Sequence, residues 1–251
     1  MDTLYGRNPI LESLRAGRRT HRRLIVAQNV QEKGAVAQIV SLARAVRIPI
    51  QRAPKQDLGR QVGHRHHQGV ALETGDYPYA ETSFMLAAAR SAGEPPFLLL
   101  LDLLQDPQNV GALLRTAEAV GVHGVILQER RAVGVTPAVV NSSSGAAEHL
   151  LVAQETNLVR TMRELKEANL WLYGLESGPE AIPFHQVDLG GPIGLVVGGE
   201  GAGLRRLVRQ TCDQLIRLPM RGRIASLNAA VAGSVALYAV WQKRGFGEGE
   251  P

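Results

Sequence analysis

A glycine-rich stretch that directly follows a short apolar run constrains the fold more than any other feature. The run, 193–197, is bounded by glycines and is typical of a buried parallel strand. The stretch, 198–203, reads Gly-Gly-Glu-Gly-Ala-Gly and has too little side chain to be anything but a loop that another group approaches closely. A second apolar run at 215–220 and a small-residue helix ending near Trp241 follow. Strand ends followed by a loop and a helix start are where open α/β sheets bind ligands.

The region before this stretch alternates between apolar runs and amphipathic segments. The nearly continuous apolar run 97–102 predicts a central strand, and Asn109 can cap a helix at 110–120. This alternation favours a parallel sheet covered by helices. We therefore expect an α/β domain at 97–251, preceded by a linker at 76–96 that contains a short helix.

Residues 1–75 predict a smaller α/β domain with a strongly positive charge. The whole chain has a net charge of +5, but these residues hold 13 Lys and Arg against 5 Asp and Glu, and residues 76–251 hold 15 against 18. Such a segment favours a polyanionic partner such as RNA or DNA, although a solvated basic face is the alternative. Only 4% of the residues are aromatic, which favours recognition of backbone and shape over extensive base stacking.

Several classes of protein are disfavoured by the sequence. No apolar run approaches the roughly 20 residues of a membrane span, and the N-terminus does not resemble a signal peptide, so we expect a cytoplasmic protein. The single cysteine, Cys212, excludes an internal disulfide and is interpreted as a core residue. Three histidines occur within 64–67, but no Cys, Asp or Glu stands at ligand spacing, so we expect a polar loop and no metal site.

Two nucleotide-binding motifs can be tested on the glycine loop, and both fail. A dinucleotide fingerprint requires a third glycine where Leu204 stands, and an acidic residue near the position of Met220. A Walker-type phosphate loop requires Gly-Lys-Ser/Thr, and this loop contains no lysine. A nicotinamide oxidoreductase is therefore disfavoured, and a glycine cluster alone could be a tight turn.

Three polar stretches at the predicted carboxyl ends of strands resemble, in order, the three signatures of the SpoU (TrmH-like) RNA ribose methyltransferases. They are Asp-Pro-Gln-Asn-Val-Gly-Ala-Leu-Leu-Arg-Thr at 106–116, Gly-Gly-Glu-Gly-Ala-Gly-Leu at 198–204, and the segment from Leu-Pro-Met-Arg-Gly to Ser-Leu-Asn at 218–228. Shorter similarities at 5–9, 67–69 and 145–149 extend the resemblance over nearly the whole chain. One departure is Ala-Ala at 229–230, where Val-Ser is commoner.

The resemblance implies a fold, a reaction and partners. The fold is a C-terminal parallel-sheet α/β domain with a deep trefoil knot (SPOUT), preceded by a small ribosomal-protein-like α/β domain that binds RNA. Two protomers are expected to pair, and the knot loops to hold S-adenosylmethionine. The implied reaction methylates the ribose 2′-hydroxyl of a guanosine in large-subunit (23S) ribosomal RNA. The alternatives are a tRNA ribose 2′-O-methyltransferase, whose members usually lack the N-terminal domain, and a non-catalytic RNA-binding relative.

The resemblance also implies which residues carry the reaction. The expected catalytic residues are Arg115, Asn109, Glu200, Ser226 and Asn228. Arg115 is central. Because an arginine is effectively always protonated, we expect it to clamp the target phosphate bidentately rather than to act as a free base. A surface ion pair with Glu118 is the alternative for this side chain.

Cofactor and RNA contacts are implied in the same way. Gly198, Leu218 and Leu227 are expected to contact the cofactor, largely through the backbone. No metal is required by the displacement. Phosphate contacts in the N-terminal domain are expected from five arginines: Arg7, Arg18, Arg19, Arg22 and Arg23.

Overall fold

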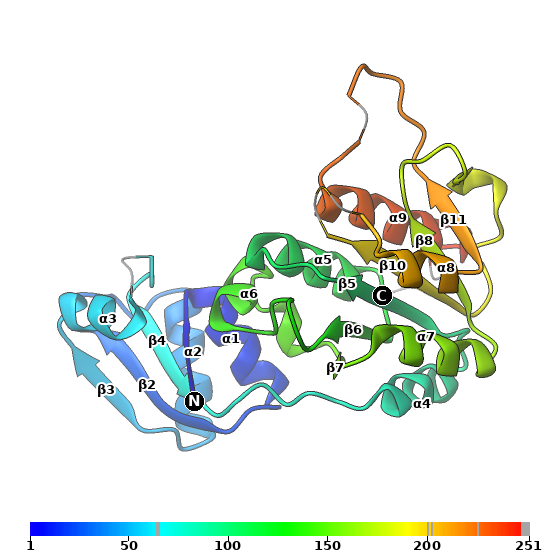
Figure 1. Cartoon of the computed structure of the whole chain (residues 1–251). Helices are drawn as coiled ribbons and strands as arrows, with labels where there is room; N and C mark the ends of the chain where they lie inside the picture. Colours follow the sequence, from blue (N-terminus) through cyan, green and yellow to red (C-terminus); the bar gives the residue numbers. More distant parts are fainter. Residues whose placement is uncertain (64–65, 200, 202, 225, 247–251) are drawn as a thin grey trace. The chain divides into compact units, whose positions relative to one another are not determined.

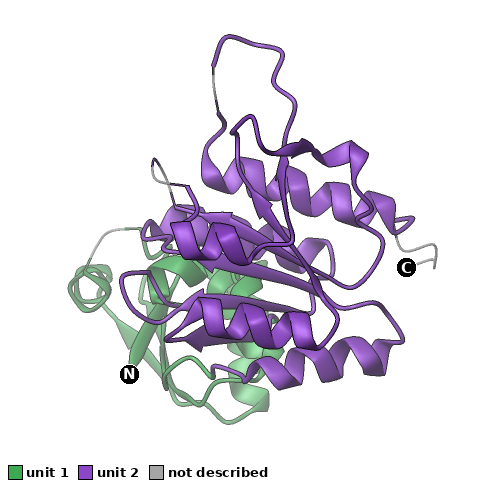
Figure 2. Cartoon of the chain, turned by 45° about the vertical axis from the view of Figure 1, so that its right-hand side comes forward, with its two compact units in different colours: residues 1–78, 135–149 green, residues 79–134, 150–251 purple. Residues whose placement is uncertain are grey.

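The computed structural model describes residues 1–63, 66–199, 201, 203–224 and 226–246. The chain divides into two compact units, one formed by residues 1–78 with 135–149 and the other by residues 79–134 with 150–251 (Figure 2). The segment 135–149 thus groups with the N-terminal residues, a feature that the sequence did not indicate. The boundaries of the predicted domains stay a prediction.

The first unit is built on a four-stranded sheet in the order β1–β4–β2–β3 (Figure 1). Its elements are β1 (Asp2–Tyr5), α1 (Arg7–Ala16), β2 (His21–Ala27), α2 (Ala35–Ala45), β3 (Ile50–Ala53), α3 (Lys55–Val62), β4 (Val70–Thr74) and α6 (Pro137–Ser142). β4 runs antiparallel to β1 and β2, and β2 runs parallel to β3. The carboxyl ends of β1, β2 and β3 therefore lie at the same edge of the sheet as the start of β4.

A buried ion pair fastens the segment 135–149 to this unit. The fully buried side chain of Arg19 donates from Nε to both carboxylate oxygens of Glu148, at 3.0 and 3.1 Å, and Nη1 lies 2.8 Å from the Asp2 carboxylate. The Arg19 guanidinium lies 4.9 Å from the centre of the Tyr77 ring, and the Tyr77 hydroxyl donates to the Ala147 carbonyl. Removing one partner of such a pair costs about 3–5 kcal/mol, because the other charge is left buried alone.

The second unit contains a seven-stranded sheet in the order β7–β6–β5–β10–β8–β11–β9. The strands are β5 (Phe97–Asp102), β6 (Gly124–Gln128), β7 (Val152–Glu155), β8 (Trp171–Leu175), β9 (Ile182–Pro183), β10 (Ile193–Gly198) and β11 (Gln214–Arg217). Every pairing is parallel, as predicted from the alternation of strands and helices. The central strands β5 and β10 are buried at every position, which explains their continuous apolar sequence.

Helices cover both faces of this sheet. One face packs with α4 (Thr82–Ala92), α7 (Leu158–Glu167) and α8 (Arg206–Thr211) in a single apolar cluster. α5 (Pro107–Ala119) and α9 (Ala229–Lys243) pack against each other, and α9 contacts β10. Within the described residues, no helix combines the length and apolar character needed to cross a lipid bilayer.

Some predicted boundaries are wrong for identifiable reasons. α5 begins at Pro107 and is capped by Asp106, whose Oδ1 accepts from the Gln108 N–H at 3.0 Å, so Asn109 is not the cap. An Asp-Pro pair supplies both a capping side chain and the favoured first helical residue, which moves the start three residues earlier. β11 ends at Arg217, so 218–220 are not part of the predicted strand. The helix expected inside the linker is α4, and its Met85 is fully buried in the apolar cluster of the second unit.

Candidate active site

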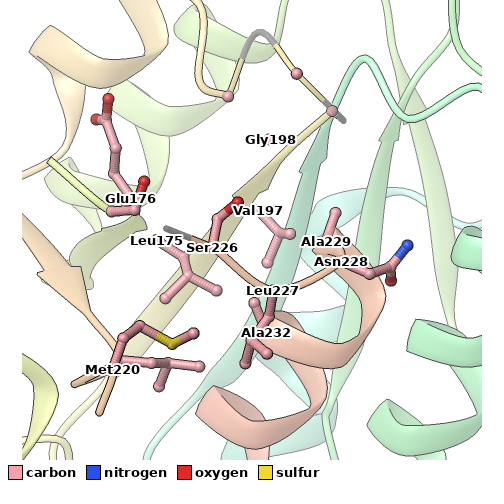
Figure 3. A pocket seen from close by; sticks show the side chains of 15 residues that line it. Leu175, Glu176, Val197, Gly198, Met220, Ser226, Leu227, Asn228, Ala229 and Ala232 are labelled. Carbon is pink, nitrogen blue, oxygen red and sulfur yellow. The ribbon is translucent and has the colours of Figure 1, made fainter. Parts of the chain in front are cut away.

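A cavity of about 550 Å³ lies at the carboxyl ends of β8 and β10 in the second unit (Figure 3). Its lining comes from the ends of these strands, from the glycine loop after β10, from Leu218 and Met220 after β11, and from 226–229 and Ala232 around the start of α9. The structure thus brings two of the three signature-like stretches together around one space. Its volume suits a small-molecule ligand.

The cavity combines an apolar surface with exposed main chain. Leu175 at the end of β8 and Met220 and Leu227 in the connection between β11 and α9 surround the same space (Figure 3). Met220 and Leu227 are 40% and 41% exposed, so their apolar side chains are accessible to a ligand in this space. Apolar walls with a few polar groups are typical of sites that hold a flat heterocycle.

The glycine loop has no room for side chains at its first two positions. A Cβ on Gly198 would lie 2.4 Å from both the carbonyl carbon and the oxygen of Gly203, and a Cβ on Gly199 would lie 2.9 Å from the carbonyl oxygen of Leu103. The Gly203 N–H donates to the Gly199 carbonyl at 3.1 Å, so the loop doubles back on itself. Main-chain groups therefore form this wall of the cavity.

A hydrogen bond between two amide side chains ties the first signature-like stretch to the cavity. Asn228 caps α9 through Oδ1, which accepts from the N–H groups of Ala230 and Val231 at 2.9 and 3.3 Å. Its Nδ2 donates to Oδ1 of the buried Asn109 at 3.1 Å. Ser226 lines the cavity but does not cap the helix. Asn109, Ser226 and Asn228 are thus brought together.

Arg115 is placed differently from these three residues. Arg115 is on the exposed side of α5, beside Thr116, whose hydroxyl is hydrogen-bonded to that of Ser234 on α9 at 2.8 Å. Among the residues that the structure describes, Arg115 is not part of the cavity lining. Glu200 lies outside the described residues.

The buried carboxylate of Asp102 was not singled out from the sequence. Asp102 ends β5, and its side chain is fully buried. It accepts from Nε of Arg205 at 2.6 Å and from the Arg205 backbone N–H at 2.9 Å, and Arg205 Nη2 also donates to Gln128 at 2.7 Å. The pair fastens the far end of the glycine loop to the central strand. An acidic residue closing the apolar run 97–102 was the available signal.

The five arginines expected to contact RNA fall into two groups. Arg7 and Arg22 are exposed, whereas Arg18 donates to the carbonyls of Glu148 and Pro78, both at 3.3 Å, and Arg23 is paired with Glu73 at 2.5 Å. The prediction for Arg19 is wrong, because its guanidinium is buried and committed to two carboxylates.

Two other reactive side chains, those of Cys212 and His67, are enclosed by the protein rather than placed at the cavity. Burial raises the pKa of the Cys212 thiol to about 12, so the thiol stays protonated near neutral pH. His67 is buried, and its Nδ1 accepts from the Gly69 N–H at 3.1 Å, while His64 lies outside the described residues. In the described part of the chain, no group of His, Cys, Asp and Glu is arranged to hold a metal ion.

Comparison with known proteins identifies relatives for both units. Residues 96–238 match the model of the SpoU rRNA Methylase family, and residues 3–80 match a model described as RNA 2′-O ribose methyltransferase substrate binding. The putative TrmH family tRNA/rRNA methyltransferase YacO of Bacillus subtilis (strain 168) is 42% identical over 243 residues, which cover 97% of this chain and 96% of the relative.

Two solved structures share the fold, one over nearly the whole chain and one over part of it. The SpoU methyltransferase AviRb from Streptomyces viridochromogenes, in complex with the cofactor AdoMet, matches with a TM-score of 0.81 and 25% identity over 98% of this chain and 91% of its own. The TrmH/SpoU tRNA modifying enzyme of A. aeolicus matches with a TM-score of 0.55 and 26% identity, over 61% of this chain and 78% of its own.

Proposed function

The chain belongs to the SpoU rRNA Methylase family, and from that premise we propose that it methylates the ribose 2′-hydroxyl of a guanosine in large-subunit (23S) ribosomal RNA. Membership in this family makes it an RNA 2′-O-methyltransferase that uses S-adenosylmethionine. The proposal adds the RNA and the nucleotide. The cavity between the glycine loop and the start of α9, with Asn109 and Asn228 joined beside it, supports the methyl transfer, and the match of residues 3–80 to a substrate-binding model supports the RNA.

The lining of the cavity fits the cofactor. Leu218 and Leu227 supply apolar surface, and the glycine loop from Gly198 supplies main-chain donors and acceptors, which together suit an adenine ring. When bound, S-adenosylmethionine supplies an electrophilic methyl group on a cationic sulfonium. In this proposal the chain itself contributes orientation, because an in-line displacement depends on alignment of the reacting atoms.

The proposed roles of the polar residues follow from their positions. Arg115 clamps an RNA phosphate next to the target ribose with two parallel hydrogen bonds, and a phosphate oxygen or a water takes the hydroxyl proton. The Asn109–Asn228 hydrogen bond holds α5 and α9 in the relative position that places Arg115 for this clamp. Ser226 faces the reacting centre, and Glu200 is proposed to orient the RNA or neighbouring groups.

The length of the match favours ribosomal RNA over tRNA. The tRNA modifying enzyme of A. aeolicus covers 61% of this chain, and the substrate-binding model accounts for residues 3–80. A basic N-terminal unit with exposed Arg7 and Arg22 supports contacts to the backbone of a large RNA. The trefoil knot is also proposed, and it is supported by the fold shared with AviRb.

Mapping of the modified nucleotide tests the assignment. Purified protein is incubated with labelled S-adenosylmethionine and, in separate reactions, with unmodified 23S rRNA and with bulk tRNA. Ribose methylation is then located by nuclease digestion and mass spectrometry. We expect a single methylated guanosine in 23S rRNA. Methylation of tRNA alone would support the tRNA alternative, and cofactor binding without methylation of either RNA would support the non-catalytic one.

We also propose that two protomers pair through α9. Val231, Val235 and Tyr238 follow one another at helical spacing, and they are 50%, 44% and 46% exposed. Among the described residues, Arg115 is not part of the cavity lining. A second protomer that covers the exposed face of α9 would add its own side chains to each active site. An apolar helical stripe is a common basis for a two-fold interface.

Replacing Val235 with glutamate is expected to convert the dimer to a monomer, because a carboxylate would be buried at the centre of the stripe. The measurement is molar mass by light scattering after size-exclusion chromatography. Val46, which is 60% exposed in the first unit, provides the matched control, and Val46→Glu should remain dimeric. A wild-type protein that elutes as a monomer, or an unchanged mass for Val235→Glu, would contradict this interface.

A further inference from the structure

A second hollow, of about 700 Å³, opens at one edge of the four-stranded sheet in the first unit. Each of the four connections at this edge contributes to it: Arg7 follows β1, Asn29 follows β2, Lys55 follows β3, and His66 and Gln68 precede β4. These residues are far apart in sequence and meet because β4 runs antiparallel to its neighbours. The carboxyl ends of strands are a common location for ligand sites in α/β sheets.

The described lining is positively charged and contains no acidic side chain. Arg7 is held in place, since its backbone N–H donates to Oε1 of Gln68 at 2.9 Å and its Nε donates to the Gln68 carbonyl at 3.4 Å. Its Nη1 and Nη2 have no acceptor among the described residues. The guanidinium is therefore oriented and still able to bind an anion.

Lys55 adds a second cation at an unfavourable position. It is the first residue of α3, where the helix dipole disfavours a positive charge, and it is exposed. Within the described chain it forms no ion pair that would offset this. An anion in the hollow would interact favourably with Lys55 and Arg7 together.

We propose that this hollow binds one unstacked nucleotide of single-stranded RNA. The phosphate lies against Arg7 and Lys55, and the amides of Asn29 and Gln68 provide donors and acceptors for the base edge or the ribose hydroxyl. The lining that the structure describes contains no Phe, Tyr or Trp side chain, and the imidazole of His66 is its one flat ring, so binding depends mainly on charge and hydrogen bonds. The inference rests on the proposed function for the choice of RNA as the polyanion, and it adds a subsite separate from the methyl-transfer cavity.

The test compares two charge-removing variants of the full-length protein. Lys55→Gln removes a cation from the hollow. Arg44→Gln removes one from the last turn of α2, which lies at the opposite edge of the sheet, before β3 begins. Binding of a fluorescent single-stranded RNA and of a duplex of the same length is measured by anisotropy at several salt concentrations. Titration with S-adenosylmethionine checks that each variant retains its other site.

We expect Lys55→Gln to weaken single-stranded RNA binding by about fivefold to tenfold. The slope of log affinity against log salt should decrease by about one for this variant. Duplex binding should change less, and Arg44→Gln should bind like wild type, because an unstacked nucleotide is accessible only in single strands.

The outcomes separate this proposal from the proposed function. Equal affinity of Lys55→Gln and Arg44→Gln for single-stranded RNA, or a larger loss for the duplex, would overturn the subsite whether or not the enzyme methylates RNA. If wild-type protein methylates no RNA but its single-strand affinity still depends on Lys55, the proposed function fails and the subsite stands. A wild-type protein without affinity for single-stranded RNA would overturn the subsite directly.

Discussion

Replacing Arg115 with lysine is expected to lower the rate of methyl transfer to RNA by about a hundredfold or more. The proposed clamp depends on the planar guanidinium, which holds two phosphate oxygens at once, whereas an ammonium group is a single point of charge. Because Arg115 is exposed on α5 and does not line the described cavity, the affinity for S-adenosylmethionine should not change. Single-turnover rates and calorimetric titration of the cofactor measure the two effects separately.

Arg163→Lys provides the control for Arg115→Lys, since Arg163 is also an exposed arginine on a helix of the second unit. It should methylate RNA at the wild-type rate. Turnover of Arg115→Lys close to that of wild type would contradict bidentate clamping and would leave Arg115 as a surface residue. Loss of cofactor affinity in Arg115→Lys would instead assign this side chain to the cofactor site.

The strands of the second unit were predictable because burial leaves a strong local pattern. β5 and β10 are covered on both faces, so nearly every residue in them is apolar, and flanking glycines and prolines define their limits. α7 is one of the amphipathic segments before the glycine loop, and its apolar residues recur at helical spacing. β1 has four residues, and its N-terminal position offered no such pattern, so it was missed.

Contacts between distant residues were not predictable. Arg19 and Glu148 are 129 positions apart, and nothing in either neighbourhood indicates that they form a buried pair. Arg19 therefore looked like one of several RNA-binding arginines. Deletion of residues 1–75 would remove Arg19 and leave Glu148 buried without its cation. The stability and activity of such a fragment would therefore not be those of the second unit alone.

The candidate site could be predicted only in part, for similar reasons. The glycine loop and the residues around Asn228 carry strong local signals, and the structure places them around one cavity. The Asn109–Asn228 bond joins residues 119 positions apart, and the Asp102–Arg205 pair joins residues 103 positions apart. Both depend on the order of strands in the sheet, which local sequence patterns do not specify.

Adding one methyl group at Gly198 is expected to lower the affinity for S-adenosylmethionine by about a hundredfold. In Gly198→Ala the new Cβ would lie 2.4 Å from the Gly203 carbonyl, so the loop must move. It cannot move away from the strand easily, because Gly199 is in contact with Leu103 and the far end of the loop is fastened by the Asp102–Arg205 pair. The displacement is therefore directed into the cavity.

Calorimetric titration of the cofactor measures this loss, and Gly191→Ala is the matched control. Gly191 precedes β10, its φ is not in the left-handed region, and a Cβ there would meet no atom within 4 Å. A cooperative thermal unfolding transition like that of wild type, followed by circular dichroism, shows whether the whole Gly198→Ala variant, including the second unit, is folded. If the folded variant binds the cofactor as tightly as Gly191→Ala, the glycine loop is not a wall of the cofactor site, and the proposed site itself would have to be placed elsewhere on the sheet.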